Sequence, residues 1–225
     1  MDLIERMERL RISDEPDDGT RRAPPMSDGR NRAVFVDRDG VINHDTIHLW
    51  KIEELSIIEG VKEAMEGFRD MGFLLVVTTN QAGIGKGLYG KEEFIALMEE
   101  IVKRLGGEPP WDRVYFSPYH SEAVIERYRT MHVDRKPEPG MLLRGARDLD
   151  IDLKRSYMVG DHIKDVQAAH RAGCSAVLVL TGRGKNELKR IVDEGVRPGD
   201  ERYPDMVVQD IMYAYLAIRQ KEDPN

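Results

Sequence analysis

Apolar residues in this chain form short continuous runs that alternate with segments of helical spacing. The runs read as buried strands, and they cover residues 33–36, 73–79, 113–117, 156–160, 175–180 and 206–208. Between them, apolar residues recur every three or four positions, which predicts helices over 61–71, 94–105, 139–149, 165–172, 185–194 and 209–220. Continuous apolar strands alternating with helices indicate a parallel sheet covered on both faces. We therefore predict an α/β, Rossmann-like three-layer sandwich with a central parallel sheet.

The first 32 residues do not follow this alternation. Leu3, Ile4, Met7 and Leu10 lie at helical spacing and predict a short helix. Residues 13–32 are rich in Asp, Pro, Gly and Arg, a composition typical of a disordered linker. We therefore divide the chain into an N-terminal extension, 1–32, and one domain, 33–225. No candidate site residue precedes position 32, so the extension is expected to be dispensable for chemistry.

Composition excludes several classes of function. A net charge of −7 argues against a protein that coats nucleic acid. No apolar run approaches the ~20 residues that span a bilayer, so no membrane partner is expected. The acidic N-terminus lacks the apolar core of a signal peptide, which predicts a cytoplasmic location. Cys174 is the only cysteine, so an internal disulfide and a cysteine-cluster metal site are both excluded.

Polar side chains gather where three of the predicted strands end. The carboxyl ends of parallel strands meet at one edge of the sheet, where ligands bind. Two carboxylates held close together need a cation or a shared proton. A solvated turn accounts for any one cluster but not easily for three at the same edge. The clusters are Asp37 with Asp39, then Thr79, Asn80 and Gln81, then Asp161 with Asp165.

These clusters resemble the motifs of the haloacid dehalogenase superfamily of phosphohydrolases. The motifs are strand-D-x-D-G at Asp37 to Gly40, a Thr that ends a strand at Thr79, a Lys at Lys136, and G-D-x-x-x-D at residues 160–165. DRDGVIN, TTNQAGIGKG, DRKPEPGML and YMVGDHIKDVQAA further resemble the branch of heptose-bisphosphate and histidinol-phosphate phosphatases, over residues 33–182. That branch has no large cap domain, and the loops at 44–56 and 117–134 are too short to form one.

The resemblance implies a role for each motif residue. Asp37 would attack phosphorus to form an aspartyl-phosphate, and Asp39 would protonate the leaving oxygen and then activate water. Asp37 should therefore start ionised and Asp39 protonated. Thr79 and Lys136 would bind phosphate oxygens. Mg²⁺ would bind the Asp37 carboxylate, the Asp39 backbone carbonyl and the Asp161 carboxylate, an oxygen-rich set that suits this cation.

Further residues are implied around this centre. Asp165 would orient Lys136 or a metal-bound water, or would only cap the helix that follows. Asn80 and Gln81 resemble the substrate-contacting pair of the narrower branch, and Arg135 resembles its substrate-recognising arginine. A guanidinium suits bidentate binding of phosphate, so a second phosphate on the substrate is expected.

The chain departs from the narrower branch in one loop. That branch often carries a zinc loop of Cys and His before the RKP segment. Ser117, Tyr119, His132 and Asp134 stand at the ligand positions here, with no thiolate among them. We therefore expect no structural zinc, and leave open whether His120, His132 and Asp134 retain a metal.

The predicted function is a Mg²⁺-dependent phosphatase for a small phosphorylated substrate, with D-glycero-D-manno-heptose 1,7-bisphosphate as the leading candidate. The alternative is a histidinol-phosphate phosphatase. A non-catalytic binding module on the same fold would be expected to lack some of the motif carboxylates and the lysine, and all are present. Without long cap loops, which are a common dimerisation surface, the chain is expected to be a monomer.

Overall fold

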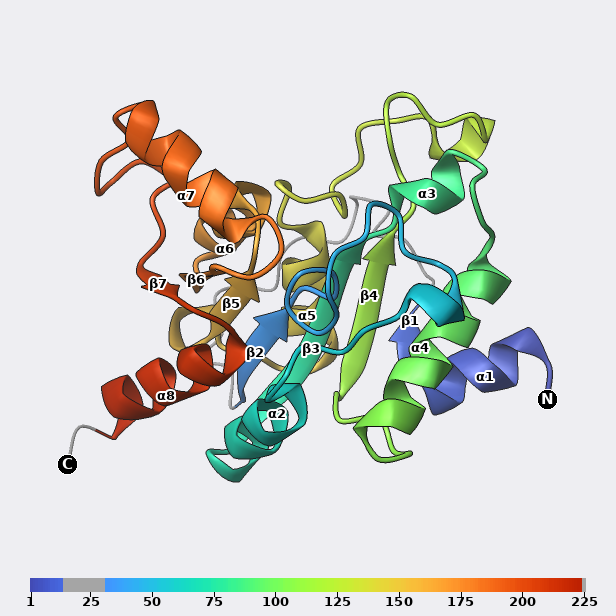
Figure 1. The fold of residues 1–225 in the computed structure, drawn as a ribbon, viewed down its shortest axis with the longest axis horizontal. Coiled ribbons are helices and arrows are strands. Elements are labelled where there is room, and N and C mark those ends of the chain that lie inside the picture. The colour runs from blue at the N-terminus through green and yellow to red at the C-terminus, as the bar shows by residue number, and fades with distance from the viewer. Residues whose placement is uncertain (14–30, 224–225) are drawn as a thin grey trace.

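The computed structural model describes residues 1–13 and 31–223 and places the described strands in one parallel sheet of order β1-β4-β3-β2-β5-β6-β7 (Figure 1). From β2 the chain adds β3 and β4 on one side, then β5, β6 and β7 on the other. This confirms the predicted α/β class and parallel sheet. The strands are β1 (Ile12–Ser13), β2 (Arg32–Val36), β3 (Phe73–Asn80), β4 (Arg113–Ser117), β5 (Tyr157–Gly160), β6 (Ser175–Val179) and β7 (Met206–Val208).

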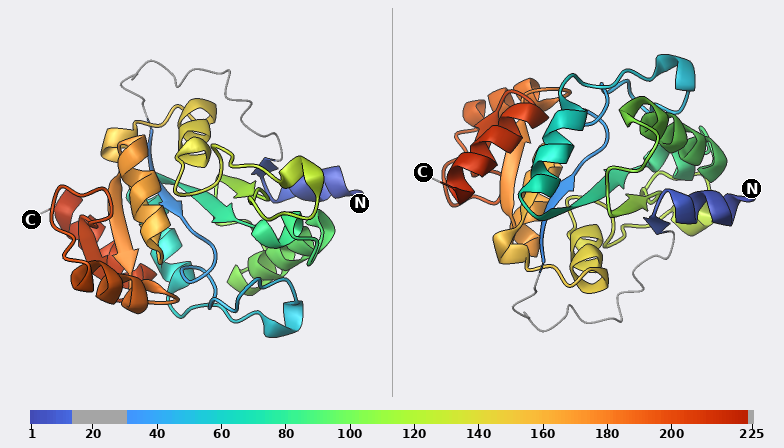
Figure 2. Two further views of the ribbon diagram at one scale, coloured as in Figure 1. Left: turned by 90° about the horizontal axis from the view of Figure 1, so that it is seen from above. Right: turned by 90° about the horizontal axis from the view of Figure 1, so that it is seen from below.

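Helices cover both faces of this sheet, as Figure 2 shows from above and below. The short α3 and three 3-10 turns, η1 (Ile52–Glu54), η2 (Glu126–Tyr128) and η3 (Leu153–Arg155), were not predicted because they are too short to show periodicity. The α-helices are α1 (Leu3–Arg9), α2 (Val61–Asp70), α3 (Ala82–Gly85), α4 (Lys91–Leu105), α5 (Gly140–Asp148), α6 (Ile163–Ala172), α7 (Gly184–Asp193) and α8 (Ile211–Glu222).

The central strand β2 shows how the two faces are separated. Successive side chains of a strand point to opposite faces. Val34 and Val36 accordingly join the apolar cluster under α2, α4 and α8, whereas Ala33 and Phe35 join the cluster under α5 and α6. All four are fully buried, which explains why this run reads as continuous apolar sequence rather than as an alternating pattern.

The N-terminal segment adds a strand that the sequence analysis did not predict. Ile12 and Ser13 pair in parallel with Val114 and Tyr115 of β4. The indole N–H of Trp111 donates to the carbonyl oxygen of Leu10 at 2.9 Å, and Leu10 is fully buried. The predicted linker falls mainly on residues 14–30, which lie outside the described part of the chain. The predicted helix is present as α1, and together with β1 it packs on the edge of the domain.

Deleting this segment should cost stability but not catalysis. A chain that starts at Met26 would lose Met7, Leu10 and Ile12 from the core and expose the edge of β4. Each buried apolar side chain contributes about 1.5–3 kcal/mol, so we expect the free energy of unfolding to fall by several kcal/mol. Urea unfolding measures this loss, and kcat at low temperature should match that of the full chain. A large fall in kcat for the folded, shortened chain would show that the segment reaches the active site.

The loops that follow β2 and β4 stay short in the structure. Residues 44–56 and 117–134 contain only η1 and η2, so neither segment forms a separate cap. Among the helices of residues 1–13 and 31–223, none combines the length and the apolar character that crossing a bilayer requires.

Candidate active site

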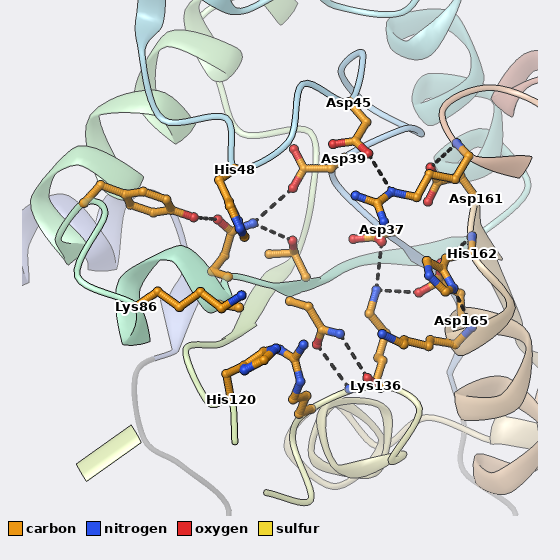
Figure 3. Close-up of a pocket in the computed structure, with 18 residues that line it drawn as sticks. Asp37, Asp39, Asp45, His48, Lys86, His120, Lys136, Asp161, His162 and Asp165 are labelled. Carbon is orange, nitrogen blue, oxygen red and sulfur yellow. Dashed lines mark hydrogen bonds and ion pairs between the residues drawn. The ribbon is translucent and has the colours of Figure 1, made fainter. Parts of the chain in front are cut away.

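The site lies at the carboxyl edge of β2, β3 and β5. Because β3 and β5 flank β2 on opposite sides, the loops that leave these strands diverge and open a crevice. A cavity of about 200 Å³ occupies this crevice (Figure 3). The structure brings all of the predicted site residues to its wall: Asp37, Asp39, Thr79, Asn80, Gln81, Arg135, Lys136, Asp161 and Asp165.

Three carboxylates and one lysine form the floor of the cavity. Oxygens of Asp37, Asp161 and Asp165 lie within 4.8 Å of one another. The Lys136 ammonium lies 3.0 Å from Asp37 and 2.6 Å from Asp165, and it donates to the carbonyl oxygen of Thr78 at 2.8 Å. One ammonium group thus faces three carboxyl groups in a largely buried place.

Asp165 contacts both Lys136 and the start of helix α6, although the N-cap of that helix is His162 and Asp165 is its N3 residue. Oδ1 pairs with Lys136, while Oδ2 accepts from the backbone N–H of His162 at 3.0 Å and so completes the capping box of helix α6. Asp165 is therefore anchored at one end and orients the lysine with the other.

Glycines make room for the Asp161 carboxylate. A Cβ atom on Gly40 would lie 2.0 Å from Asp161 Oδ2, and one on Gly182 would lie 2.1 Å from the same atom. Both glycines have positive φ, +79° and +51°, a region that other residues seldom adopt. Asp161 Oδ2 also accepts from the backbone N–H of Arg183 at 2.8 Å. The loops after β2 and β6 thus approach this carboxylate closely through their backbone atoms.

The electrostatics of the floor favour a divalent cation. Burial raises the pKa of Asp37 to about 7, with Asp165 and Asp39 adding to the rise and Lys136 opposing it. Burial, with Asp165 and Asp37 nearby, raises the pKa of Asp161 to about 8. Burial acts to lower the pKa of Lys136, but the two carboxylates outweigh it and the pKa is raised. Oxygen donors with uncompensated negative charge match what Mg²⁺ requires.

Asp39 is surrounded by hydrogen-bond donors. Its two oxygens accept from Arg38 Nη2, both at 2.8 Å, and from the side-chain amides of Asn43 at 3.0 Å and Gln81 at 3.2 Å. Every one of these partners is a donor, and the Arg38 guanidinium that lies directly against the carboxylate is buried. The predicted acid and base role of Asp39 stays a prediction.

The polar residues at the end of β3, together with Gln81 just after it, form the middle of the site. The side chain of Asn80 makes two hydrogen bonds with the backbone of Lys136. Its Nδ2 donates to the lysine carbonyl at 3.0 Å, and its Oδ1 accepts the lysine N–H at 3.1 Å. Gln81 Nε2 donates to Thr79 Oγ1 at 2.8 Å. Asn80 is thus tied to the backbone of Lys136 while it also lines the cavity, and its predicted contact with substrate stays a prediction.

The loop at 117–134 does not gather the three candidate metal ligands. His120 lines the active-site cavity, whereas His132 stacks on Tyr119 with ring centroids 3.8 Å apart. Asp134 is buried and pairs with the Arg144 guanidinium of α5 at 3.1 Å. Among the residues that the structure describes, the only His, Cys, Asp and Glu side chains that converge as a possible metal site are those of the floor.

The absence of a structural zinc ion stays a prediction. We expect purified and dialysed protein to carry far less than one zinc per chain, because His132 stacks on Tyr119 and Asp134 pairs with Arg144. Elemental analysis measures this. Near-stoichiometric zinc, with stability lost on chelation, would contradict the prediction.

Basic side chains also line the cavity, and sequence reasoning missed most of them. Figure 3 shows Lys86 and His120 on the side of the pocket away from Asp161 and Asp165. Arg183 lies next to Asp161, whose Oδ2 accepts its backbone N–H. Besides Lys136, the basic side chains of the lining are His48, Lys86, His120, Arg135, His162, Lys164 and Arg183. Lys86 lies in QAGIGKG and Lys164 in GDHIKD, so their places next to motifs were the available signal.

These cations act on one another. Burial lowers the pKa of Lys164, and Arg135 and Arg183 lower it further. Burial also lowers the pKa of His120, as do Arg135 and Lys86. Arg183 pairs with Asp45 at 2.9 Å, and Arg135 donates to the carbonyl of Tyr119 at 2.8 Å. In the described residues, the ammonium groups of Lys86 and Lys164 have no comparable hydrogen bond or ion pair, so they are available to an anion.

Comparisons with known proteins agree with this geometry. A family model described as HAD-hydrolase-like matches residues 133–213. The chain is 39% identical over 169 residues to D-glycero-alpha-D-manno-heptose-1,7-bisphosphate 7-phosphatase of Burkholderia mallei (strain ATCC 23344), covering 75% of this chain and 89% of that protein. It is 37% identical over 194 residues to D-glycero-beta-D-manno-heptose-1,7-bisphosphate 7-phosphatase of Escherichia coli (strain K12), covering 85% and 96%.

A solved structure resembles the fold over nearly its whole length. It is the D,D-heptose 1,7-bisphosphate phosphatase from B. bronchiseptica, complexed with magnesium and phosphate. The TM-score is 0.71 at 28% identity, and the match covers 84% of this chain and 99% of that one. Sequence relatives and fold point to the same family, and the motif residues meet in one cavity. The chain therefore belongs to the haloacid dehalogenase-like hydrolases and is a phosphatase of that family.

Proposed function

We propose that this phosphatase hydrolyses a sugar bisphosphate, with D-glycero-D-manno-heptose 1,7-bisphosphate as the leading substrate and the C7 phosphate as the group removed. The observation that carries the proposal is that the cavity is lined both by the carboxylates of the floor and by basic side chains, of which Lys86 lies on the side away from Asp161 and Asp165. The floor suits the phosphoryl group that reacts. Lys86, Lys164 and Arg135 suit a second phosphate at the other end of a short substrate. The sugar bisphosphates in the names of the relatives support the same choice.

The first chemical step would be carried out by Asp37. One carboxylate oxygen attacks phosphorus while the bond from phosphorus to the leaving oxygen breaks, giving an aspartyl-phosphate. The opposite side of the Asp37 carboxylate is fixed, because Oδ1 accepts the N–H of Arg38 at 2.7 Å. Lys136, 3.0 Å from Oδ2, and Thr79 would bind the oxygens of the transferring group.

Asp39 would move protons in both half-reactions. The approaching phosphate is an anion, and a nearby like charge favours protonation of a carboxylate. Protonated Asp39 then gives its proton to the leaving alkoxide. In the second step it takes a proton from water as that water attacks phosphorus, which releases inorganic phosphate and restores Asp37.

Mg²⁺ would be held by the carboxylates of Asp37 and Asp161 and by the backbone carbonyl of Asp39. Bound there, the cation would neutralise charge between the nucleophile and the phosphate. Asp165 is committed to Lys136 and to the helix cap, so it would act on this centre through the lysine.

A phosphate-release assay with Mg²⁺ tests the proposal. The substrates are the alpha and beta anomers of the heptose 1,7-bisphosphate, the matching heptose 7-phosphate, and histidinol phosphate. We expect the highest kcat/KM for one bisphosphate anomer, with heptose 1-phosphate as product. Replacing Lys86 and Lys164 by Gln should raise KM for the bisphosphate more than for the 7-phosphate. A preference for histidinol phosphate, or equal effects on both sugar phosphates, would contradict the proposed substrate.

Binding of Mg²⁺ should strengthen as pH rises from about 6 to about 8.5, because protons compete with the cation for the carboxylates. The pKa values of Asp37 and Asp161, about 7 and about 8, place the competition in this range. Calorimetric titration in buffers of different ionisation enthalpy measures both the affinity and the protons released. Asp161→Asn should reduce both quantities. An affinity that does not change with pH would contradict the proposed ligands.

A further inference from the structure

Tyr89 is a buried tyrosine at the cavity wall that belongs to none of the recognised motifs. It lies between α3 and α4 and is only 7% exposed. Its hydroxyl donates to Gln81 Oε1 at 2.6 Å, a short hydrogen bond between two buried side chains. Gln81 in turn contacts Thr79 and Asp39, so Tyr89 stands one residue away from both the phosphate-binding hydroxyl and the proposed acid–base group.

The hydrogen bond from Tyr89 sets the orientation of the Gln81 amide. The oxygen of an amide can only accept and its nitrogen can only donate. With Oε1 held by the phenol, Nε2 must face the other way, where it donates to Thr79 Oγ1 at 2.8 Å and to Asp39 Oδ2 at 3.2 Å. Turned over, the amide would place its oxygen against the Asp39 carboxylate, with two acceptors in contact and no proton between them.

Packing keeps the phenol in this place. A Cβ atom on Gly83 would lie 2.1 Å from the Tyr89 ring, so only glycine fits beneath it. On another side the Tyr89 ring stacks on Trp50, with centroids 6.4 Å apart and 20° between the planes. Burial raises the pKa of Tyr89 to about 12, so the hydroxyl is a donor throughout the neutral range.

The oriented amide has a consequence at each of its two contacts. Thr79 Oγ1 accepts from Gln81, so its own proton is directed to another acceptor, and a phosphate oxygen in the cavity can receive it. Asp39 is held on its side of the cavity by the same nitrogen. A misoriented amide would compete with the phosphate for the threonine proton and would repel Asp39.

We propose that Tyr89 is a positioning residue for phosphoryl transfer: through Gln81 it orients the donor that holds Asp39 and directs the Thr79 hydroxyl toward the phosphate. This inference rests on the proposed roles of Asp39 and Thr79. Tyr89 itself touches neither the phosphate nor the leaving group. Its effect should therefore depend on Gln81 and on how much the leaving group needs a proton.

The test is Tyr89→Phe, which removes only the hydroxyl. Two esters are compared under saturating Mg²⁺: 4-nitrophenyl phosphate, whose leaving group needs little protonation, and the heptose bisphosphate, whose leaving alkoxide needs a proton. A positioned acid contributes about 10²–10⁴-fold to rate, and we expect partial loss, about tenfold in kcat for the sugar phosphate. The loss for the aryl ester should be several-fold smaller, and KM should change little for both.

Two further variants make the test specific. In a Gln81→Met background, Tyr89→Phe should have no additional effect, because the amide through which it acts is gone. Tyr115→Phe is the matched control, since Tyr115 is also buried and donates to a carboxylate, Asp148, at 2.9 Å outside the cavity. It should lower stability without changing kcat.

The outcomes separate the inference from the function on which it rests. If the wild-type chain hydrolysed neither ester, the proposed function would be wrong and the inference with it. If the wild type is active, three results would overturn the inference alone. They are a kcat that Tyr89→Phe does not change, an equal loss of kcat on both esters, or a loss of kcat that is just as large in the Gln81→Met background.

Discussion

Asp37→Asn should reduce phosphate release by at least about 10⁴-fold, the scale on which loss of an essential group acts in hydrolases. The amide cannot attack phosphorus as the carboxylate does. It still accepts the N–H of Arg38 through its oxygen, so the backbone of the loop should keep its place. Steady-state assays measure the loss. Acid quenching followed by mass spectrometry should detect a phosphoryl adduct on the peptide of wild-type Asp37 and none in the variant.

The same substitution should not destabilise the fold. A carboxyl whose pKa is raised on folding keeps a proton that the unfolded chain has already released, so Asp37 makes wild-type stability fall as pH rises from about 4, its pKa in the unfolded chain, to about 7, its pKa in the fold. Relative to wild type, the variant should therefore gain stability as pH rises from about 4 to about 7, with little further change above that range. Asp148→Asn, outside the cavity, is the matched control and should retain activity. Turnover near the wild-type rate by Asp37→Asn would remove Asp37 as the nucleophile.

Lys136→Met should lower the free energy of unfolding by about 3–5 kcal/mol at pH 8 without a divalent cation, because removing one member of a buried ion pair leaves the others uncompensated. Lys136 is 1% exposed and lies within 3.0 Å of both Asp37 and Asp165. Turnover should also fall sharply, since the phosphate loses its buried cation. Urea unfolding of wild type and variant measures the loss of stability.

The destabilisation caused by Lys136→Met should depend on pH and on Mg²⁺. The pKa values of Asp37 and Asp161 are raised to about 7 and about 8, so these groups are largely neutral at pH 5.5 and their repulsion is relieved. The loss should therefore be smaller at low pH, and Mg²⁺ should restore part of it at pH 8. Lys164→Met, at the half-buried rim, should show little of either effect. A loss independent of pH and of Mg²⁺ would mean that packing, not charge, makes Lys136 important.

Most of the elements could be predicted because their signals are local. The run RVYFS coincides with β4, and the helical spacing of Phe94 to Leu105 lies within α4. The strand β1 could not be predicted, because two residues carry no period and their pairing with Val114 and Tyr115 joins segments about a hundred positions apart. The prediction that residues 1–32 form an extension outside the domain stays untested for residues 14–30. Strand β1, however, pairs with β4, so part of this segment belongs to the sheet.

The motif side chains of the site could also be placed from sequence, since each stands at the end of a strand or in a family motif. The amino-acid sequence alone therefore predicted the parallel α/β fold, which the structure confirms, and the catalytic roles of Asp37, Asp39, Thr79, Lys136 and Asp161, which stay predictions. The distribution of charge among these residues could be seen only in the folded chain. The tertiary structure set Asp39 among donors, raised the pKa of Asp37 and Asp161, and brought the loops of Tyr89, Lys86 and Arg183 to the same cavity. The physical reason is that periodicity and motif spacing are properties of neighbouring residues, whereas burial, hydrogen-bond direction and Coulomb interactions arise between segments that meet only when the sheet has formed.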